Sequence, residues 1–125
     1  MIPITRPCVG DEEAAAAAEA VRSGWLSQGA RVQEFEAAVA RYVGSRHAVA
    51  TANCTTALHL ALIAAGVGPG DEVITQANTF IATVSAILAA GATPVLVDCD
   101  EHGSYEPAAF AAAIGPRTKA LIPVH

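Results

Sequence analysis

Hydrophobic positions in residues 1–50 follow the spacing of helices. Apolar side chains recur every three or four positions across residues 30–44, at Val32, Phe35, Val39 and Val43. This spacing predicts an amphipathic helix that ends at Gly44. Residues 11–24 begin with three acidic residues and end at Gly24. Because acidic side chains favour a helix N-terminus and glycine follows a helix C-terminus, a first helix is predicted there.

From residue 47 onward, short apolar runs alternate with longer helix-like segments. The expected strands are 47–52, 68–75 (which begins with a turn), 93–100 and 119–125, and the expected helices are 55–66, 79–91 and 106–115. Such alternation, divided by glycine and proline turns, predicts βαβ units on a parallel sheet. Because the strands are continuous apolar runs, we expect helices to cover both faces of the sheet. The predicted fold class is therefore α/β, with three layers and a mainly parallel sheet.

Two segments in this part of the chain also indicate how they are packed. Residues 55–66 are apolar nearly all round, which predicts a buried helix. Residues 119–125 have the composition of an interior strand. Parallel strands are normally followed by a helix that covers the sheet. We therefore expect residues 1–125 to be cut from a longer chain.

Composition and charge narrow the possible partners. The chain has 125 residues and a formal net charge of −5, with its seven Lys and Arg residues scattered. Nucleic-acid binding relies on clustered positive charge, so no nucleic-acid partner is expected. No apolar run reaches the roughly 18 residues that span a bilayer, so no membrane association is expected. The N-terminal residues lack a signal-peptide pattern, which makes the cytoplasm the expected location.

Cysteine and histidine spacing predicts no metal site. Cys8, Cys54 and Cys99 fit no metal-binding spacing and are interpreted as reduced thiols. The four histidines do not pair with one another at metal spacing. His59 falls within an apolar helix and is interpreted as a core histidine.

Residues 53–56, Asn-Cys-Thr-Thr, join an expected strand to an expected helix. A helix N-terminus offers free N–H groups and the positive end of the helix dipole, which suit a phosphate, and threonine hydroxyls add donors. The commoner alternative is that Asn53 or Thr55 simply caps the helix. The local sequence leaves both interpretations open.

Phe80 stands at the next strand-to-helix junction. The carboxyl ends of parallel strands line one edge of a sheet, so Phe80 would lie on the same edge as Thr55 and could stack on a flat ring. The alternative is a core phenylalanine. Asp98 and Asp100 end a strand on that same edge and are weak candidates for an acid–base pair. His125, at the end of another strand on this edge, is the more suggestive of the four histidines.

Trp25 lies in the glycine-bounded segment 24–29, GWLSQG. It is either a ligand contact or a packing anchor between two helices. The GVGPG segment at 66–70 follows a helix and precedes a strand, which is the reverse of a dinucleotide-binding turn. The chain also contains no GxxxxGK[ST] loop, so nucleotide-binding loops are excluded.

Five blocks of sequence occur in a recognisable order, namely GWLSQGARVQEFE, NCTTALHLAL, GPGDEVITQANTFIAT, GATPVLVDCD and PRTKALIPVH. Together they resemble the N-terminal part of the DegT/DnrJ/EryC1/StrS family of sugar aminotransferases, and the resemblance covers essentially the whole chain. These enzymes use pyridoxal 5′-phosphate (PLP) and have the type I aspartate-aminotransferase fold. The resemblance implies that residues 1–125 are the N-terminal part of the large domain of such an enzyme.

The resemblance also implies which residues bind cofactor and substrate. Cys54, Thr55 and Thr56 correspond to the turn that holds the cofactor phosphate, with Cys54 in the usual place of a glycine. Phe80 corresponds to the aromatic residue that stacks on the pyridine ring. The loop that approaches the substrate corresponds to Gly24, Trp25, Leu26 and Ser27. The implied partners are a nucleotide-linked keto-sugar, an amino donor (glutamate) and a second subunit in a homodimer.

The catalytic residues of the family have no counterpart in this sequence. An aspartate that pairs with the pyridine nitrogen and a lysine that forms the Schiff base both lie beyond the position matching His125. The single lysine, Lys119, matches a strand residue. We therefore expect no catalytic residue within residues 1–125. Two alternatives to aminotransfer stay open: a PLP-dependent sugar dehydratase of the same family, with histidine in place of the lysine, and a non-catalytic interaction module.

Overall fold

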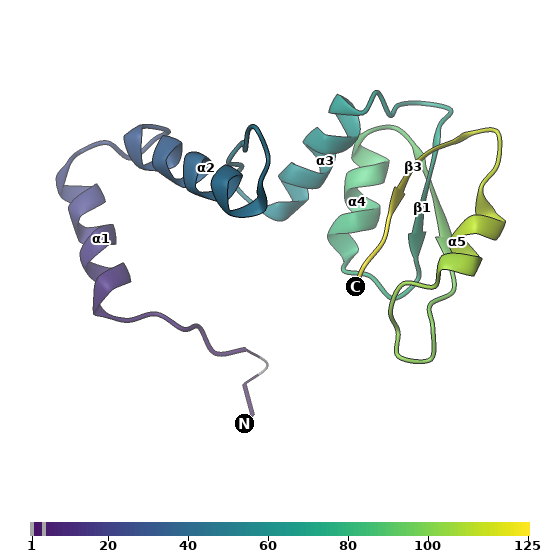
Figure 1. Ribbon diagram of the computed structural model, residues 1–125, viewed down its shortest axis with the longest axis horizontal. Helices are drawn as coiled ribbons and strands as arrows, with labels where there is room; N and C mark the ends of the chain where they lie inside the picture. The colour runs from purple at the N-terminus through teal and green to yellow at the C-terminus, as the bar shows by residue number, and fades with distance from the viewer. Residues whose placement is uncertain (1, 4) are drawn as a thin grey trace. The chain divides into compact units, whose positions relative to one another are not determined.

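The computed structural model describes residues 2–3 and 5–125, and the chain divides into two units, Met1–Ala50 and Thr51–His125. The first unit contains α1 (Asp11–Arg22) and α2 (Ala30–Val43) (Figure 1). Both predicted helices are confirmed. α2 ends where expected, because Gly44 adopts the left-handed conformation, with φ 74°, that closes a helix. An ion pair between Arg31 and Glu19, 2.6 Å apart, links α2 to α1.

The first unit has almost no core of its own. Of its described residues, Ala40 alone is fully buried. Phe35, which belongs to the predicted apolar face of α2, is 61% exposed. Val43 and Tyr42, near the end of the same helix, are 63% and 92% exposed. α2 is thus amphipathic in sequence while its apolar face lies largely open.

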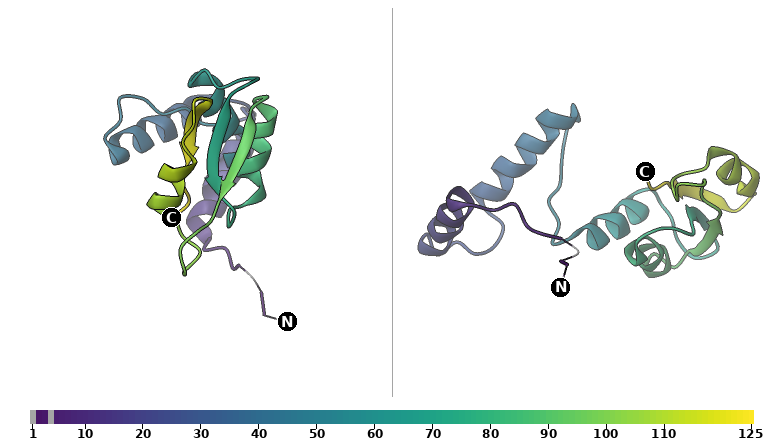
Figure 2. Two further views of the ribbon diagram at one scale, coloured as in Figure 1. Left: turned by 90° about the vertical axis from the view of Figure 1, so that its right-hand side faces the viewer. Right: turned by 90° about the horizontal axis from the view of Figure 1, so that it is seen from below.

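The second unit is a layered α/β structure. Its elements are α3 (Cys54–Ala64), β1 (Glu72–Gln76), α4 (Ile81–Ala89), β2 (Thr93–Val97), α5 (Pro107–Ala113) and β3 (Thr118–Ile122). The three strands are parallel and lie in the order β2-β1-β3, with β1 in the centre (Figure 2, left). The register pairs Ile74 with Val95 on one side and with Leu121 on the other. The predicted α/β class and parallel sheet are confirmed.

Helices cover both faces of this sheet because of the strand order. The chain passes from β1 to β2 on one side of it, and then crosses back over β1 to form β3 on the other side, so the two connections run in opposite directions across the sheet. Since both crossovers are right-handed by the usual rule, α4 and α5 fall on opposite faces. Figure 1 shows the two helices on either side of the strands. α3 packs beside α4, which completes that layer.

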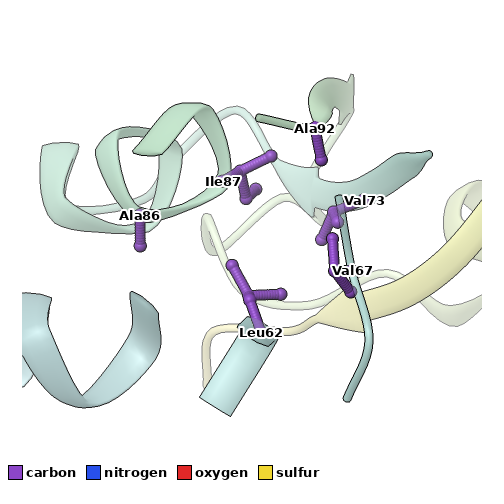
Figure 3. Close-up of a cluster of buried hydrophobic side chains, with 6 residues drawn as sticks. All are labelled: Leu62, Val67, Val73, Ala86, Ile87 and Ala92. Carbon is purple, nitrogen blue, oxygen red and sulfur yellow. The ribbon is translucent and has the colours of Figure 1, made fainter. Parts of the chain in front are cut away.

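The main core lies between α3, α4 and β1. It contains the buried side chains of Leu62, Val67, Val73, Ala86, Ile87 and Ala92, which come together in Figure 3. Because strand residues alternate between faces, Ile74 and Gln76 lie opposite Val73, on the α5 side. Phe110 of α5 is almost completely buried.

Within the described part of the chain, no helix is long and apolar enough to span a membrane.

Two predictions, one for the segment where the two units meet in the sequence and one for α3, were wrong. No strand forms at 47–52, although the segment is apolar. A strand needs a partner for its backbone groups, and this segment pairs with neither edge strand of the described sheet, β2 or β3. The α3 helix is also less buried than expected, because α4 covers one side of it only. Leu60 and Ile63 remain about half exposed, while Leu62 faces the core.

Candidate functional site

The residues predicted to bind the cofactor lie toward one end of the second unit. β1, β2 and β3 are parallel, so they end together at an edge that we name the carboxyl edge. α4 follows β1 and begins at this edge. α3 leads into β1 through the short segment 65–71, so its start lies toward the same end of the second unit, to one side of the sheet (Figure 1). The first turns of α3 and α4 and the segments after the three strands thus lie at the same end of the second unit.

The start of α3 is capped by Asn53. The Thr56 N–H donates to Asn53 Oδ1 over 2.9 Å, and Thr56 Oγ1 donates to the same oxygen over 3.1 Å. The capping interpretation of this turn is confirmed for Asn53. The turn needs no glycine, because none of the described non-glycine residues has a positive φ, and Cys54 is already the first residue of α3. A cysteine in the place of the family glycine is therefore unstrained.

Capping leaves part of this helix end free to bind an anion. Cys54 and Thr55 are exposed, and no hydrogen bond within the described residues occupies their N–H groups or the Thr55 hydroxyl. Helix N-terminal N–H groups and the dipole end favour a negatively charged group. The Thr56 hydroxyl is engaged with Asn53, so Thr55 is the more available of the two threonines.

Phe80 is not a core residue. It is the residue before α4, it has extended backbone angles, and its side chain is 76% exposed. Its carbonyl oxygen accepts the Thr83 N–H over 3.0 Å, so its backbone is held at the start of the helix. The hydroxyls of Thr79 and Thr83, 2.8 Å apart, also link the segment before Phe80 to the helix. The ring is thus an open flat surface on a fixed backbone at the carboxyl edge.

A hydrogen-bond network behind this edge was missed by sequence reasoning. Gln76, the last residue of β1, bonds to Gly103 in the segment after β2 and to Val124 in the segment after β3. Asn78 donates to the same Gly103 oxygen. The one available signal was a glutamine at the end of an apolar strand, because a buried amide needs partners.

The other candidates at the carboxyl edge, Asp98, Asp100 and His125, have different surroundings. The Asp100 carboxylate accepts the N–H groups of His102 and Ser104 over 2.9 and 2.7 Å, so it shapes its own loop. Asp98 is exposed. The His125 ring lies 6.0 Å from the Tyr105 ring, edge to face. Within the described residues, no group of three or more His, Cys, Asp or Glu side chains could hold a metal ion.

Two further residues lie outside the carboxyl edge. Lys119, the only lysine, follows the first residue of β3 and therefore lies toward the opposite edge of the sheet. It is the extra residue of the register shift between β1 and β3. His59 is half-buried in α3.

The predicted substrate loop belongs to the first unit. Trp25 is 64% exposed, and its indole N–H donates to the Gln28 carbonyl oxygen over 2.7 Å. Its ring lies against Gly29, where an added Cβ would come within 2.2 Å of the indole nitrogen. The loop borders an open hollow of about 760 Å³ lined by Trp25, Leu26, Ser27, Arg31 and Val32, among others. The Trp25 ring is thus held against Gly29 and Gln28 beside an open hollow.

Comparison with known proteins shows to which family the chain is related. Residues 7–125 match the DegT/DnrJ/EryC1/StrS aminotransferase family. The chain is 50% identical over 125 residues to spore coat polysaccharide biosynthesis protein SpsC of Bacillus subtilis. That match covers 99% of this chain and 32% of SpsC.

Solved structures match over nearly the whole chain. The PLP-form of Spr1654 from Streptococcus pneumoniae matches with a TM-score of 0.90 and 36% identity, over 98% of this chain and 31% of that one. NtdA from Bacillus subtilis with bound cofactor PMP matches with a TM-score of 0.86 and 34% identity, over 94% of this chain and 28% of that one. The chain thus spans about a third of the length of these relatives.

Proposed function

Because the chain belongs to the DegT/DnrJ/EryC1/StrS aminotransferase family, we propose that it is the N-terminal part of the large domain of a PLP-dependent sugar aminotransferase. The complete enzyme transfers an amino group from glutamate to a keto-sugar carried on a nucleotide. The name of SpsC, a polysaccharide biosynthesis protein, supports a sugar substrate. The PLP-form of Spr1654 and the PMP bound to NtdA support the cofactor.

The observation that carries this proposal is the exposed Phe80 ring at the same end of the unit as the open first turn of α3. PLP combines a flat ring with a phosphate, so its site needs a stacking surface and an anion-binding group. The residues present fit both requirements. Phe80 offers a ring face, and α3 offers the N–H groups of Cys54 and Thr55.

Each of these residues has a defined part in holding the cofactor. The N–H groups of Cys54 and Thr55 and the Thr55 hydroxyl bind the phosphate, and Asn53 keeps the turn in shape through Thr56. Phe80 stacks on the ring and fixes its plane. When bound, PLP supplies an electron sink for removal of a proton from the amino-bearing carbon. This chain supplies binding and orientation only, since the matched catalytic positions of the family lie outside it.

Residues of the first unit serve the substrate and the second subunit. Gly24, Trp25, Leu26 and Ser27 contact the sugar substrate, and the hollow beside Trp25 supports that role. The complete enzyme is a homodimer. The open apolar face of α2 supports this proposal, because exposed apolar patches mark surfaces that become covered in an assembly.

The experiment that tests the cofactor site removes the Phe80 ring in the complete protein that carries this chain. We expect Phe80→Ala to raise the Kd for PLP about tenfold, because the ring contact is lost. Leu88→Ala is the matched control, since Leu88 is exposed near the other end of the same helix. Its Kd should stay within twofold of the parent value. Equal Kd values for Phe80→Ala and the parent protein would remove Phe80 from the site.

A further inference from the structure

Gln76 is the most deeply buried amide side chain at the carboxyl edge. It is the last residue of β1, and no part of it is exposed. Its Nε2 donates to the Gly103 carbonyl oxygen over 3.1 Å, and its Oε1 accepts the Val124 N–H over 3.0 Å. Reversing the amide would place donor against donor and acceptor against acceptor, so this orientation is the one that satisfies both partners.

The two partners of Gln76 belong to the other two strands. Gly103 lies in the segment that follows β2, and Val124 lies in the segment that follows β3. One side chain of the central strand therefore ties together the exits of all three strands. These bonds span 27 and 48 positions of the sequence.

Gly103 is fixed from a second direction. Asn78 Nδ2 donates to the same carbonyl oxygen over 2.9 Å, so Gly103 accepts one hydrogen bond from each of two side chains. The approach is close, because a Cβ at Gly103 would lie 2.5 Å from Asn78 Nδ2. The φ of Gly103 is +79°, a conformation that glycine adopts without strain.

Val124 is held from both sides as well. Its N–H donates to Gln76, and its carbonyl oxygen accepts the Tyr105 N–H over 3.1 Å. Tyr105 packs its ring on Phe110, with ring centroids 4.7 Å apart, and stands 6.0 Å from the His125 ring. The segments after β2 and β3 are thus bonded to each other as well as to Gln76.

We propose that Gln76 is a positioning residue for the cofactor site, which sets where the segments after β2 and β3 stand relative to the Phe80 ring. The inference rests on the function proposed above. Gln76 is four residues before Phe80 on the same strand exit, so the distance from the Phe80 ring to the neighbouring strand exits depends on the bonds of Gln76. A buried amide is expensive unless fully paired, and here its pairing fixes one arrangement of the three exits.

The test compares Gln76→Met with Thr75→Val in the complete protein that carries this chain. Methionine has nearly the length of glutamine but makes neither hydrogen bond. Thr75 is equally buried and donates one hydrogen bond, over 2.9 Å, to the Ile122 carbonyl oxygen of β3, so it is bonded within the sheet rather than to the exits. Three quantities are measured: the Kd for PLP, the visible circular dichroism of bound PLP, and the unfolding midpoint of the cofactor-free protein.

We expect Gln76→Met to raise the Kd for PLP about tenfold and to change the visible circular dichroism, because the groups beside the ring are displaced. Thr75→Val should lower the unfolding midpoint but leave the Kd within twofold and the spectrum unchanged. If Gln76→Met leaves the Kd and the spectrum at the parent values, the inference is overturned. It is also overturned if Thr75→Val alters them to the same extent, since the effect would then follow stability alone.

Asn78→Ala keeps the test decisive if Gln76→Met does not fold. Asn78 is exposed, so its loss should leave the unfolding midpoint unchanged while freeing Gly103 from one of its two donors. A Kd raised about threefold with an altered spectrum supports the inference, and parent values contradict it. Failure of the parent protein itself to bind PLP would instead overturn the proposed function, so the two failures are distinguishable.

Discussion

The helices of the two units bury their apolar side chains to very different extents. In Thr51–His125, helices cover both faces of a sheet and bury Leu62, Ile87 and Phe110. In Met1–Ala50, two helices leave Phe35 and most other apolar side chains open. Isolated helices of this length are marginal in water, because most helix stability in proteins comes from packing. An amphipathic pattern therefore predicts a helix, but it does not predict whether the apolar face of that helix is covered within the chain.

The largest effect expected from this difference comes from one phenylalanine in each unit. Phe110 is 1% exposed, whereas Phe35 is 61% exposed. Phe110→Ala should lower the free energy of unfolding of the 125-residue chain by about 3–5 kcal/mol, because it removes buried area and leaves a cavity. Phe35→Ala should change it by less than about 0.5 kcal/mol, as for a surface substitution. Denaturant unfolding followed by circular dichroism measures both values.

The same pair of variants tests whether a larger assembly covers the first unit. In the complete protein, a loss of more than about 2 kcal/mol for Phe35→Ala would show that the open face of α2 is buried there. A loss equal to that in the 125-residue chain would contradict the homodimer contact proposed for this face.

A smaller effect is expected from two matched glycines. Gly44 follows α2 with φ 74°, and Gly66 follows α3 with φ 73°. An added Cβ would meet nothing within 4 Å at either position, so alanine adds only backbone strain, about 1–2 kcal/mol. Gly66→Ala should lower the free energy of cooperative unfolding by this amount, because α3 packs against the core. Gly44→Ala should only shorten α2, seen as lost helical signal at the end of α2 by NMR, with the main transition unmoved. Equal shifts of that transition would show that the two units unfold together.

The local sequence predicted most helices and strands correctly. It failed where a structure depends on contact with a distant segment of the chain. Gly44 and the acidic first turn of α1 act within a few residues, so they could be read from the sequence. The apolar run at 47–52 looked like a strand, but strand formation depends on a partner that the local sequence does not contain. In the same way, the one-sided cover of α3 depends on where α4 lies.

In the candidate site, too, the local features could be predicted from the sequence and the long-range contacts could not. Phe80 could be placed at the carboxyl edge from the order of β1 and α4, whereas the placement of Thr55 depended on a strand at 47–52 that does not form. The resemblance to a family gave both residues their roles. The exposure of Phe80, which excludes a core residue, became evident only in the structure. The bonds of Gln76 join residues 27 and 48 positions away, and no local pattern shows such partners. Long-range hydrogen bonds are thus the part of the site that one sequence does not reveal.

The smallest effect is expected at the start of α1, in the open unit. The Glu13 carboxylate accepts the Gly10 N–H over 2.7 Å. This bond, with a further one from the Glu13 backbone N–H, holds the pKa of the Glu13 carboxyl below its ordinary value. A lowered pKa means that the ionised form is favoured in the helix. The stabilisation is therefore complete above the ordinary pKa of glutamate and is lost as the pH falls through the lowered value.

We expect the first turn of α1 to fray as the pH is lowered through that range, while the core of the second unit shows no matching change. NMR titration of the Glu13 side chain and of the Gly10 and Ala14 amides measures both the pKa and the fraying. Glu13→Gln keeps an acceptor for the Gly10 N–H but cannot ionise, so it should abolish the pH dependence, whereas Glu12→Gln, in the same turn, should preserve it. If Glu13 titrates at its ordinary pKa, the bond to Gly10 does not persist in solution. The open unit would then lack even this local stabilisation, and the contrast with the second unit would be sharper still.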